Sequence, residues 1–301
     1  LNNRLTGSFE YFIRRTKGMV GPPAEIGAAL GTTLPNTNNA ELENKGWDLN
    51  ISWRDRIGQV NYDLGFNLSD NRAKVKKYPN ASKAIYQADG VTYAYYDGKT
   101  IGEIWGYEAN DLFLTNQEVD EYLRGVDMSF FKPNKDWQRG DLKYIDSNGD
   151  GKIDPGSGTL KDHGDLKIIG NTTPRYSFGL NLHAGYKGFE VSALFQGVMK
   201  RDFPMAASTY LFSGDSNFFK EHLDYYNVYN PGAYLPRLTK PDSPEYNANV
   251  GYNTSRYLLN AAYMRLKNLM ISYNFQPKLV KKMGLENLNV YFTCDNLFTS
   301  D

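Results

Sequence analysis

Residues 47–69, WDLNISWRDRIGQVNYDLGFNLS, decide the fold because apolar and polar residues alternate along both halves of this stretch. A period of two places successive side chains on opposite faces of a β-strand. The short turn RDRIG separates the halves, so the stretch is predicted to be a β-hairpin with one apolar and one polar face. The apolar face is formed by Trp47, Leu49, Ile51, Trp53, Val60, Tyr62, Leu64, Phe66 and Leu68.

The same alternation returns further along the chain. Residues 176–197 contain a second pair of alternating runs around the tight turn YKG, and residues 262–294 contain a third pair around QPKLVKKMGLEN. An earlier run, SFEYFIR at residues 8–14, is a further strand candidate. Together with the strand pair near 47–70, these segments predict an all-β, antiparallel protein.

Long polar insertions separate the predicted hairpins. One runs from about residue 71 to 174 and contains the short helix candidate NQEVDEYLR; the other runs from about 201 to 260. Short turns at one end of the strands and long loops at the other are typical of outer-membrane β-barrels, whose loops face outside. A soluble β-sandwich or soluble barrel, in which an inner face alternates in the same way, remains the alternative.

Composition narrows the function. The 301 residues include 34 basic and 34 acidic side chains, so net charge gives no reason to expect binding to nucleic acid. The 23 Tyr, 16 Phe and 28 Gly favour β-strands and turns, and the single cysteine excludes an internal disulfide framework. No apolar run approaches the roughly 20 residues of a transmembrane helix, so a membrane protein of this sequence would cross as a barrel.

Residues 146–157, DSNGDGKIDPGS, resemble a calcium-binding loop. Such a loop supplies oxygen ligands from alternate positions, with a glycine at the sixth position and a bidentate carboxylate at the twelfth. Ser157 occupies the twelfth position and offers one weak oxygen, which Asp162 or Asp165 could replace. A turn rich in Asn, Asp and Gly that binds no metal is the alternative. The candidate calcium ligands are Asp146, Asn148, Asp150, the Lys152 carbonyl oxygen and Asp154.

No catalytic constellation is evident. His163, His183 and His222 are far apart and lack the spacing of a zinc site. His183 falls on a polar strand face and is interpreted as lining a lumen, while Cys294 is interpreted as a buried or lipid-facing thiol. The protein is therefore predicted not to be an enzyme.

Aromatic residues are concentrated in two loop segments, AIYQADGVTYAYYDG at 84–98 and HLDYYNVYNPGAYLPRL at 222–238. Aromatic rings beside Asn and Asp suit the binding of sugars. Packing of the loops on themselves, or docking against a partner, is the preferred interpretation, because insertions this long must bury something to stay ordered.

Several segments together resemble the C-terminal barrel of the SusC/RagA family of TonB-linked outer-membrane proteins of Bacteroidetes. The resemblance runs in order over residues 39–75, 102–113, 140–154, 169–198 and 263–299. It implies a 22-stranded barrel around a plug, a SusD-like surface lipoprotein as partner, and uptake of oligosaccharides or peptides energised by TonB. It also implies that the plug domain and the final strands are absent from residues 1–301. The family commonly has Asp where this chain has Ser157.

Three functions therefore stay open. The first is part of an outer-membrane TonB-dependent nutrient importer, in contact with lipid, lipoprotein and cargo. The second is a soluble β-rich glycan-binding module. The third is a structural or adhesion domain braced by calcium. Dependence on a membrane separates the first from the others, and dependence of the whole fold on calcium would identify the third.

Overall fold

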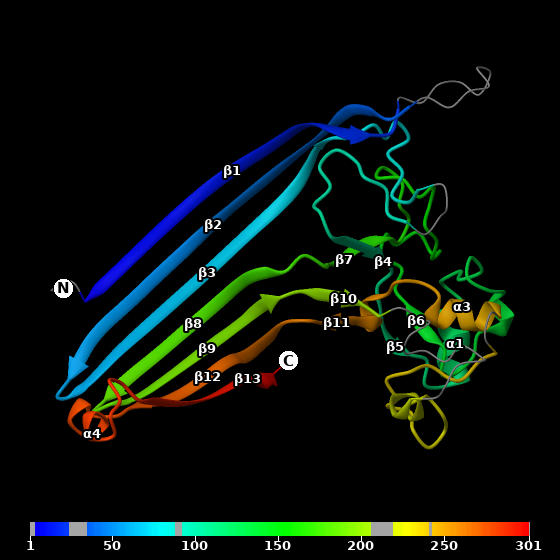
Figure 1. Ribbon diagram of the computed structural model, residues 1–301. Helices are drawn as coiled ribbons and strands as arrows, with labels where there is room; N and C mark the ends of the chain where they lie inside the picture. The colour runs from blue at the N-terminus through cyan, green and yellow to red at the C-terminus, as the bar shows by residue number, and fades with distance from the viewer. Residues whose placement is uncertain (1–3, 24–34, 88–91, 206–218, 241–242, 301) are drawn as a thin grey trace.

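The computed structural model describes residues 4–23, 35–87, 92–205, 219–240 and 243–300. Its main element is one seven-stranded antiparallel sheet, whose strand order is β1-β2-β3-β8-β9-β12-β13 (Figure 1). The sheet confirms the predicted all-β, antiparallel fold class. Its strands are β1 (Leu5–Gly21), β2 (Thr37–Ile57), β3 (Val60–Lys77), β8 (Arg175–Tyr186), β9 (Phe189–Lys200), β12 (Tyr263–Asn274) and β13 (Asn289–Ser300).

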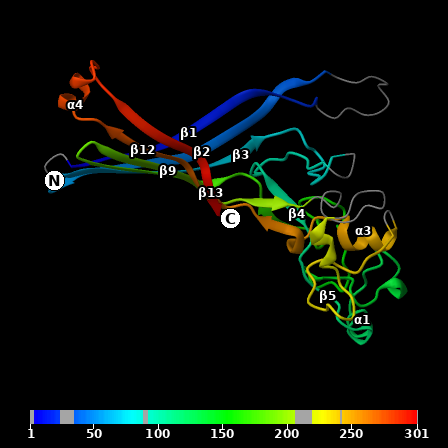
Figure 2. The same cartoon turned by 60° about the horizontal axis from the view of Figure 1, so that its bottom comes forward.

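The hairpin turns lie together at one end of the sheet. Gly58 has φ +61° between β2 and β3, and Lys187 and Gly188 have φ +47° and +92° between β8 and β9. Positive φ at the first central residue, as at Gly58, or at both, as at Lys187 and Gly188, is typical of the two-residue turns whose twist continues into paired strands. Helix α4 (Pro277–Lys282) joins β12 to β13 at the same end, as both ribbon views show (Figures 1 and 2).

The connections at the opposite end are long and fold into a compact unit, which we call the loop module (the described residues of 78–174 and 201–262). Figures 1 and 2 place it beyond the ends of the strands. No helix of the described residues is both long and apolar enough to cross a membrane. The module contains β4 (Glu103–Gly106), β5 (Ala109–Leu112), α1 (Asn116–Tyr122), η2 (Asn134–Asp136), β6 (Leu142–Tyr144), β7 (Lys167–Asn171), β10 (Asp202–Pro204), η3 (Lys220–Leu223), α3 (Pro244–Val250), η4 (Ser255–Tyr257) and β11 (Leu258–Asn260).

The hydrophobic core lies in the loop module rather than against the sheet. Phe113, Met128 and Tyr144 come from the first insertion and are fully buried, and Ala248 and Tyr257 come from the second insertion and join the same cluster. The aromatic rings meet closely; the Phe131 and Tyr144 rings, for example, stack with centroids 4.2 Å apart. The two insertions, which are separated in sequence by β8 and β9, therefore fold as one unit.

Strand register gives the sheet two chemically distinct faces. Across the ladder, Ile51 pairs with Phe66, Phe66 with Leu180, and Leu180 with Phe195. A slip of one residue would send each of these side chains to the other face, so the register is strongly specified. The apolar face is uncovered in the described structure, with Phe9 64% exposed and Phe292 63% exposed. The wall strands also extend past the range of 47–70, because β2 begins at Thr37 and β3 ends at Lys77.

Candidate functional site

The polar face of the sheet carries a row of amides. Asn50 pairs with Asn67 in the ladder, and Asn67 pairs with Gly179. Asn50, Asn67 and Asn181 line a shallow hollow of about 210 Å³. Gly179 gives the Asn67 amide its room, since a Cβ at residue 179 would lie 2.7 Å from Asn67 Nδ2. Each amide both donates and accepts hydrogen bonds, so this row can contact polar, uncharged cargo.

Two side chains singled out in the sequence lie on opposite faces. His183 is on the polar face, where Asp63 and Ser192 are its ladder partners. Cys294 lies opposite Leu269 on the apolar face, half-buried and free of any disulfide. Neither arrangement contains the base, nucleophile and anion-binding group that a hydrolytic site needs.

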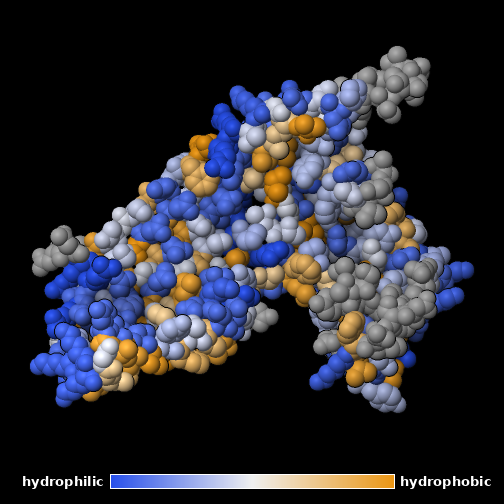
Figure 3. Space-filling model, viewed as in Figure 1, coloured by the Kyte–Doolittle hydropathy of each residue, from blue (hydrophilic) through white to orange (hydrophobic). Residues whose placement is uncertain are grey.

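A larger cavity, about 420 Å³, opens where the sheet meets the loop module. Its walls come from the ends of β3 and β9, from β7 and from the segment 100–103, and its lining is largely polar. The Arg175 guanidinium makes a bidentate ion pair with Asp70 at this junction. On the other side, the Asp202 carboxylate accepts a hydrogen bond from the Asn171 N–H at 2.8 Å. Figure 3 shows one face of the molecule, on which most residues in the region of the strands are hydrophilic and hydrophobic residues are scattered among them.

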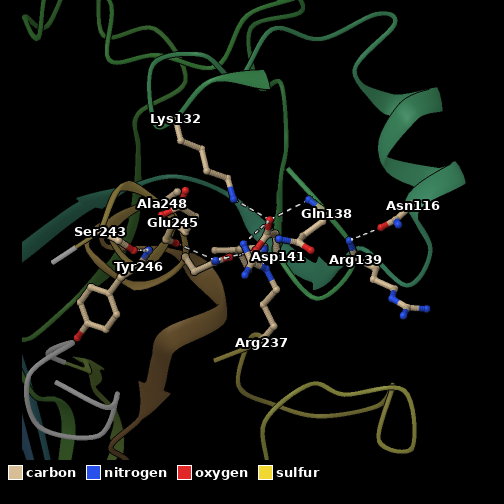
Figure 4. A network of polar contacts seen from close by, with 12 residues as sticks. Asn116, Lys132, Gln138, Arg139, Asp141, Arg237, Ser243, Glu245, Tyr246 and Ala248 are labelled. Atoms are coloured by element: carbon tan, nitrogen blue, oxygen red, sulfur yellow. Dashed lines mark hydrogen bonds and ion pairs between the residues drawn. The ribbon is translucent and has the colours of Figure 1, made fainter. Parts of the chain in front are cut away.

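A buried ion-pair network ties the two insertions together (Figure 4). The Asp141 carboxylate accepts hydrogen bonds from Lys132 Nζ at 2.7 Å and from Arg237 Nε at 2.6 Å. Asn249 Nδ2 donates to the same carboxylate at 2.9 Å, and the Asn249 amide oxygen accepts from the Leu142 N–H at 2.7 Å. Asp141 and Lys132 side chains are completely buried. One carboxylate from the first insertion thus fixes the position of two residues from the second.

Burial changes the proton affinity of this network. Desolvation lowers the pKa of the Lys132 ammonium, and the Asp141 charge opposes that shift. The Trp137 ring lies beneath the ammonium, with its centroid 4.3 Å from Nζ, so the cation also has a favourable π contact. Sequence reasoning missed all of these residues because the partners of Asp141 on the second insertion lie about a hundred positions away.

The aromatic loop segments pack mainly on the module itself. Ile85 and Tyr96 of the first segment and Tyr226 and Leu235 of the second are buried in the shared core. The second segment also exposes side chains, with Tyr229 at 95% and Leu223 at 73% exposed. Residues 88–91 of the first segment lie outside the described residues.

The calcium-like loop is closed by its own side chains. The Asp146 carboxylate accepts hydrogen bonds from the N–H groups of Gly149 at 2.7 Å and Gly151 at 2.9 Å. Asn148 and Asp150 each accept from the N–H two residues ahead, at 2.9 and 2.8 Å. These are the turns of the alternative interpretation. Within the described part of the chain, no group of three or more His, Cys, Asp or Glu side chains is placed to hold a metal ion.

Asp165 and Asp162 contact different parts of this loop. Asp165 is 1% exposed, and its carboxylate accepts hydrogen bonds from the N–H groups of Ser147 at 2.7 Å and Asp154 at 3.0 Å. Burial raises the pKa of Asp165, and the nearby Asp146 charge adds to that rise. Asp162 instead accepts the Ser157 N–H at 2.9 Å. Of the two carboxylates that could replace the missing twelfth ligand, Asp165 contacts the second and ninth positions of the loop and Asp162 contacts the twelfth.

The other two histidines are in separate parts of the loop module. The His163 ring makes an edge contact with Trp105, with centroids 5.6 Å apart. His222 lies beside Phe219, with centroids 5.4 Å apart. The structure therefore does not bring the histidines together.

Known proteins of similar sequence are TonB-dependent receptors. TonB-dependent receptor P3 of Formosa agariphila is 28% identical over 307 residues, covering 99% of this chain and 28% of that receptor. TonB-dependent receptor P26 of the same organism is 24% identical over 308 residues, with 98% of this chain and 28% of the receptor covered. No family model matches the chain.

Solved structures with the same fold come from the RagAB system. The structure of the RagAB peptide transporter superposes with a TM-score of 0.66 at 19% identity, covering 99% of this chain and 30% of the other. The RagAB peptide importer in its open-open state gives 0.68 at 17% identity, covering 100% and 30%. The chain therefore spans less than a third of the length of its relatives. The resemblance and the outer-membrane location predicted from the sequence are confirmed.

Proposed function

We propose that this chain, a stretch of SusC/RagA-type TonB-dependent receptor barrel in the bacterial outer membrane, forms part of the import path for a nutrient. The carrying observation is the two-faced sheet, because its apolar face is continuous across the strands and uncovered. In water such a face would drive aggregation, whereas in a membrane the hydrocarbon chains of lipid would cover it. That observation disfavours a soluble glycan-binding module.

The polar face and the loop module would then form the wall and the outer mouth of the path. Amides at Asn50, Asn67 and Asn181 offer hydrogen bonds without net charge, which favours weak, reversible contact with a passing solute. Both oligosaccharides and peptides are rich in groups that pair with amides. We propose one of these two classes as cargo, with energy supplied through TonB.

A surface lipoprotein of the SusD type is the proposed partner. The second insertion exposes apolar side chains at Leu223 (73%), Val228 (55%) and Tyr229 (95%), within a few residues of one another. Exposed apolar side chains close together favour a protein interface. We expect Leu223→Ser with Tyr229→Ser to reduce co-purification of the lipoprotein with the full-length receptor. The matched pair Leu114→Ser with Tyr95→Ser, exposed residues of the first insertion, should not; equal loss in both pairs would contradict this docking site.

Uptake by living cells tests the function. Cells that lack the full-length receptor would be complemented with the wild-type receptor or with Asn50→Leu and Asn67→Leu, which remove the amides from the polar face. Labelled oligosaccharides and peptides would be offered separately, with and without a collapsed proton gradient. The proposal predicts energy-dependent uptake of one class that the double variant slows. Unchanged uptake of both classes after loss of the receptor would overturn it.

We also propose that residues 146–154 bind calcium as a local brace on the loop module. Asp146, Asn148, Asp150, the Lys152 carbonyl oxygen and Asp154 would supply the ligands, with Asp165 beside them. A cation there would relieve the repulsion between Asp146 and Asp165.

A further inference from the structure

The lipid-facing side of β2 changes from aromatic to basic within one two-residue step, where Ile13 of β1 and Asp70 of β3 are the flanking residues on the same face. Tyr11 pairs with Trp47 on this face, and the Phe9 and Trp47 rings stack with centroids 6.3 Å apart. The next position on the same face of β2 is Lys45, which pairs with Arg72 of β3. Trp and Tyr are enriched where a membrane meets water. The aromatic pair therefore marks the edge of the apolar band on the loop-module side.

Five basic side chains gather just beyond this edge, and we call them the cationic belt: Arg15, Lys45, Arg72, Lys74 and Lys76. Two carboxylates lie on this face beside the belt: Asp70, which is paired with Arg175, and Glu43, which is 6% exposed. The Glu43 oxygens contact Arg15 Nε at 2.7 Å, Lys45 Nζ at 3.3 Å and Lys76 Nζ at 4.0 Å. One buried anion holds several cations in place and leaves the belt with a net positive charge.

The nearest belt residues, Lys45 and Arg72, lie at the depth of lipid headgroups, and Arg15, Lys74 and Lys76 lie further along the strands. Two residues of β-strand span about 7 Å, so Lys45 and Arg72 lie about that far beyond Trp47 along the strand. The polar layer outside the hydrocarbon core of a bilayer is roughly 5–7 Å thick on each side. All five belt residues are exposed, and the ladder places Lys45 and Arg72 on the same face as Trp47. Arg72 also lines the cavity of about 420 Å³ between the sheet and the loop module.

We propose that the cationic belt binds the phosphate groups of lipid headgroups in the outer leaflet of the membrane. Guanidinium and ammonium groups form charge-assisted hydrogen bonds with phosphate oxygens. The chain as a whole is neutral, with 34 basic and 34 acidic residues, so this local excess is not a reflection of bulk charge. Continuity with the lipid-facing band assigns the occupant to the membrane. The inference rests on the proposed orientation of the sheet in the outer membrane and not on the cargo.

Lipid retention tests this assignment directly. The full-length receptor would be reconstituted in phosphatidylcholine nanodiscs containing either bis-phosphorylated lipid A or lipid A from which both phosphates were removed. Bound lipid A would be quantified by native mass spectrometry. Wild-type receptor should retain the phosphorylated lipid, and the triple variant Lys45→Gln, Arg72→Gln, Lys74→Gln should bind it on the order of a hundredfold more weakly. Arg15 remains in this variant, so Glu43 keeps an ion-pair partner.

The matched control removes the same charge from the other end of the sheet. The variant Lys278→Gln, Lys281→Gln, Lys282→Gln changes three exposed lysines of α4 and should retain lipid A as the wild type does. Equal retention by the belt variant, equal loss in the α4 variant, or equal retention of dephosphorylated lipid A would each overturn the proposal. Lipid retention and cargo uptake are measured in separate experiments, so the lipid result can be interpreted even if the proposed import function fails.

Discussion

Asp141 shows how one residue holds two distant segments together. Its carboxylate is fully buried and is shared by Lys132 from its own insertion and by Arg237 and Asn249 from the other. A buried ion pair is weak evidence of net stabilisation, but removing one partner leaves a buried charge uncompensated. The joint between the insertions should therefore depend strongly on this side chain.

Asp141→Ala should destabilise the loop module by about 3–5 kcal/mol, because Lys132 and Arg237 would lose their counter-charge. Hydrogen exchange of the full-length receptor would show faster exchange at amides of both insertions, such as those of Leu142 and Arg237. The barrel strands should keep their protection. Asp120→Ala, at an exposed position on α1, is the control and should change exchange by less than about 0.5 kcal/mol. Loss of protection in the first insertion alone would contradict the role of Asp141 as a joint.

Glu118 gives a pH-dependent contact at the start of α1. Its carboxylate accepts hydrogen bonds from Lys143 Nζ at 2.8 Å and from the Leu114 N–H at 2.9 Å. Thr115 Oγ1 accepts a hydrogen bond from the Glu118 N–H. The Lys143 hydrogen bond is the main cause that lowers the pKa of Glu118 below 4.5. A lowered carboxyl pKa means that the contact stabilises the fold above pH 4.5 and is lost as pH falls through the lowered pKa.

Glu118→Gln should therefore cost about 0.5 kcal/mol at neutral pH, a small value because the side chain is partly exposed to solvent. The difference from wild type should vanish below the lowered pKa, where the wild-type carboxyl is protonated. Exchange of α1 amides, measured for both proteins across this range, checks the sign. A cost that grows as pH falls would be inconsistent with this account.

At the scale of elements, strand alternation was the most informative signal in the sequence. The residues predicted to share a face in 47–69 do share one, because a half-buried strand repeats every two residues whatever its partner. Strand ends were less predictable. The part of β2 from Thr37 to Gly46 does not alternate between apolar and polar residues. Both faces of the strand contact water beyond the membrane, so an apolar face is not needed there.

Arginine substitution distinguishes the two faces of β3. Phe66→Arg places a charge on the apolar face near the middle of the band and should destabilise the folded receptor by about 2–4 kcal/mol. Asn67→Arg, one residue further on, faces the polar side and should cost far less. Reversible unfolding of both variants in lipid vesicles gives the comparison. Similar costs at both positions would mean that β3 does not separate lipid from a wet lumen.

The acidic loop illustrates where sequence reasoning stops. Spacing alone identified the turn chemistry of residues 146–154, yet the position of Asp165 depends on tertiary folding and could only be offered as an option. If calcium binds, millimolar calcium should slow exchange between residues 146 and 165, and Asp146→Ala should abolish that effect. Chelation should leave the sheet unchanged; global loss of protection would instead favour a domain braced by calcium.

For the whole molecule, the wall was predictable and the loop module was not. The wall follows from a local, repetitive pattern, whereas the module depends on contacts between insertions that the sequence separates by two strands. The Tyr144 hydroxyl, for example, donates a hydrogen bond to the Ala248 carbonyl at 2.6 Å, and no local sequence pattern predicts this contact. The alternation in the sequence was enough to place the amides on the polar face, but the hollow that they line could be found only once the strand register was known.

The central claim is that one face of this sheet contacts lipid and the other contacts water. It is tested most directly by single cysteines placed in turn at residues 177–183 of β8 in a Cys294→Ala full-length receptor, in intact outer membranes. A water-soluble thiol reagent should label 177, 179, 181 and 183, and a lipid-dissolved reagent should label 178, 180 and 182. Labelling of both sets by the water-soluble reagent alone would contradict the membrane-wall account.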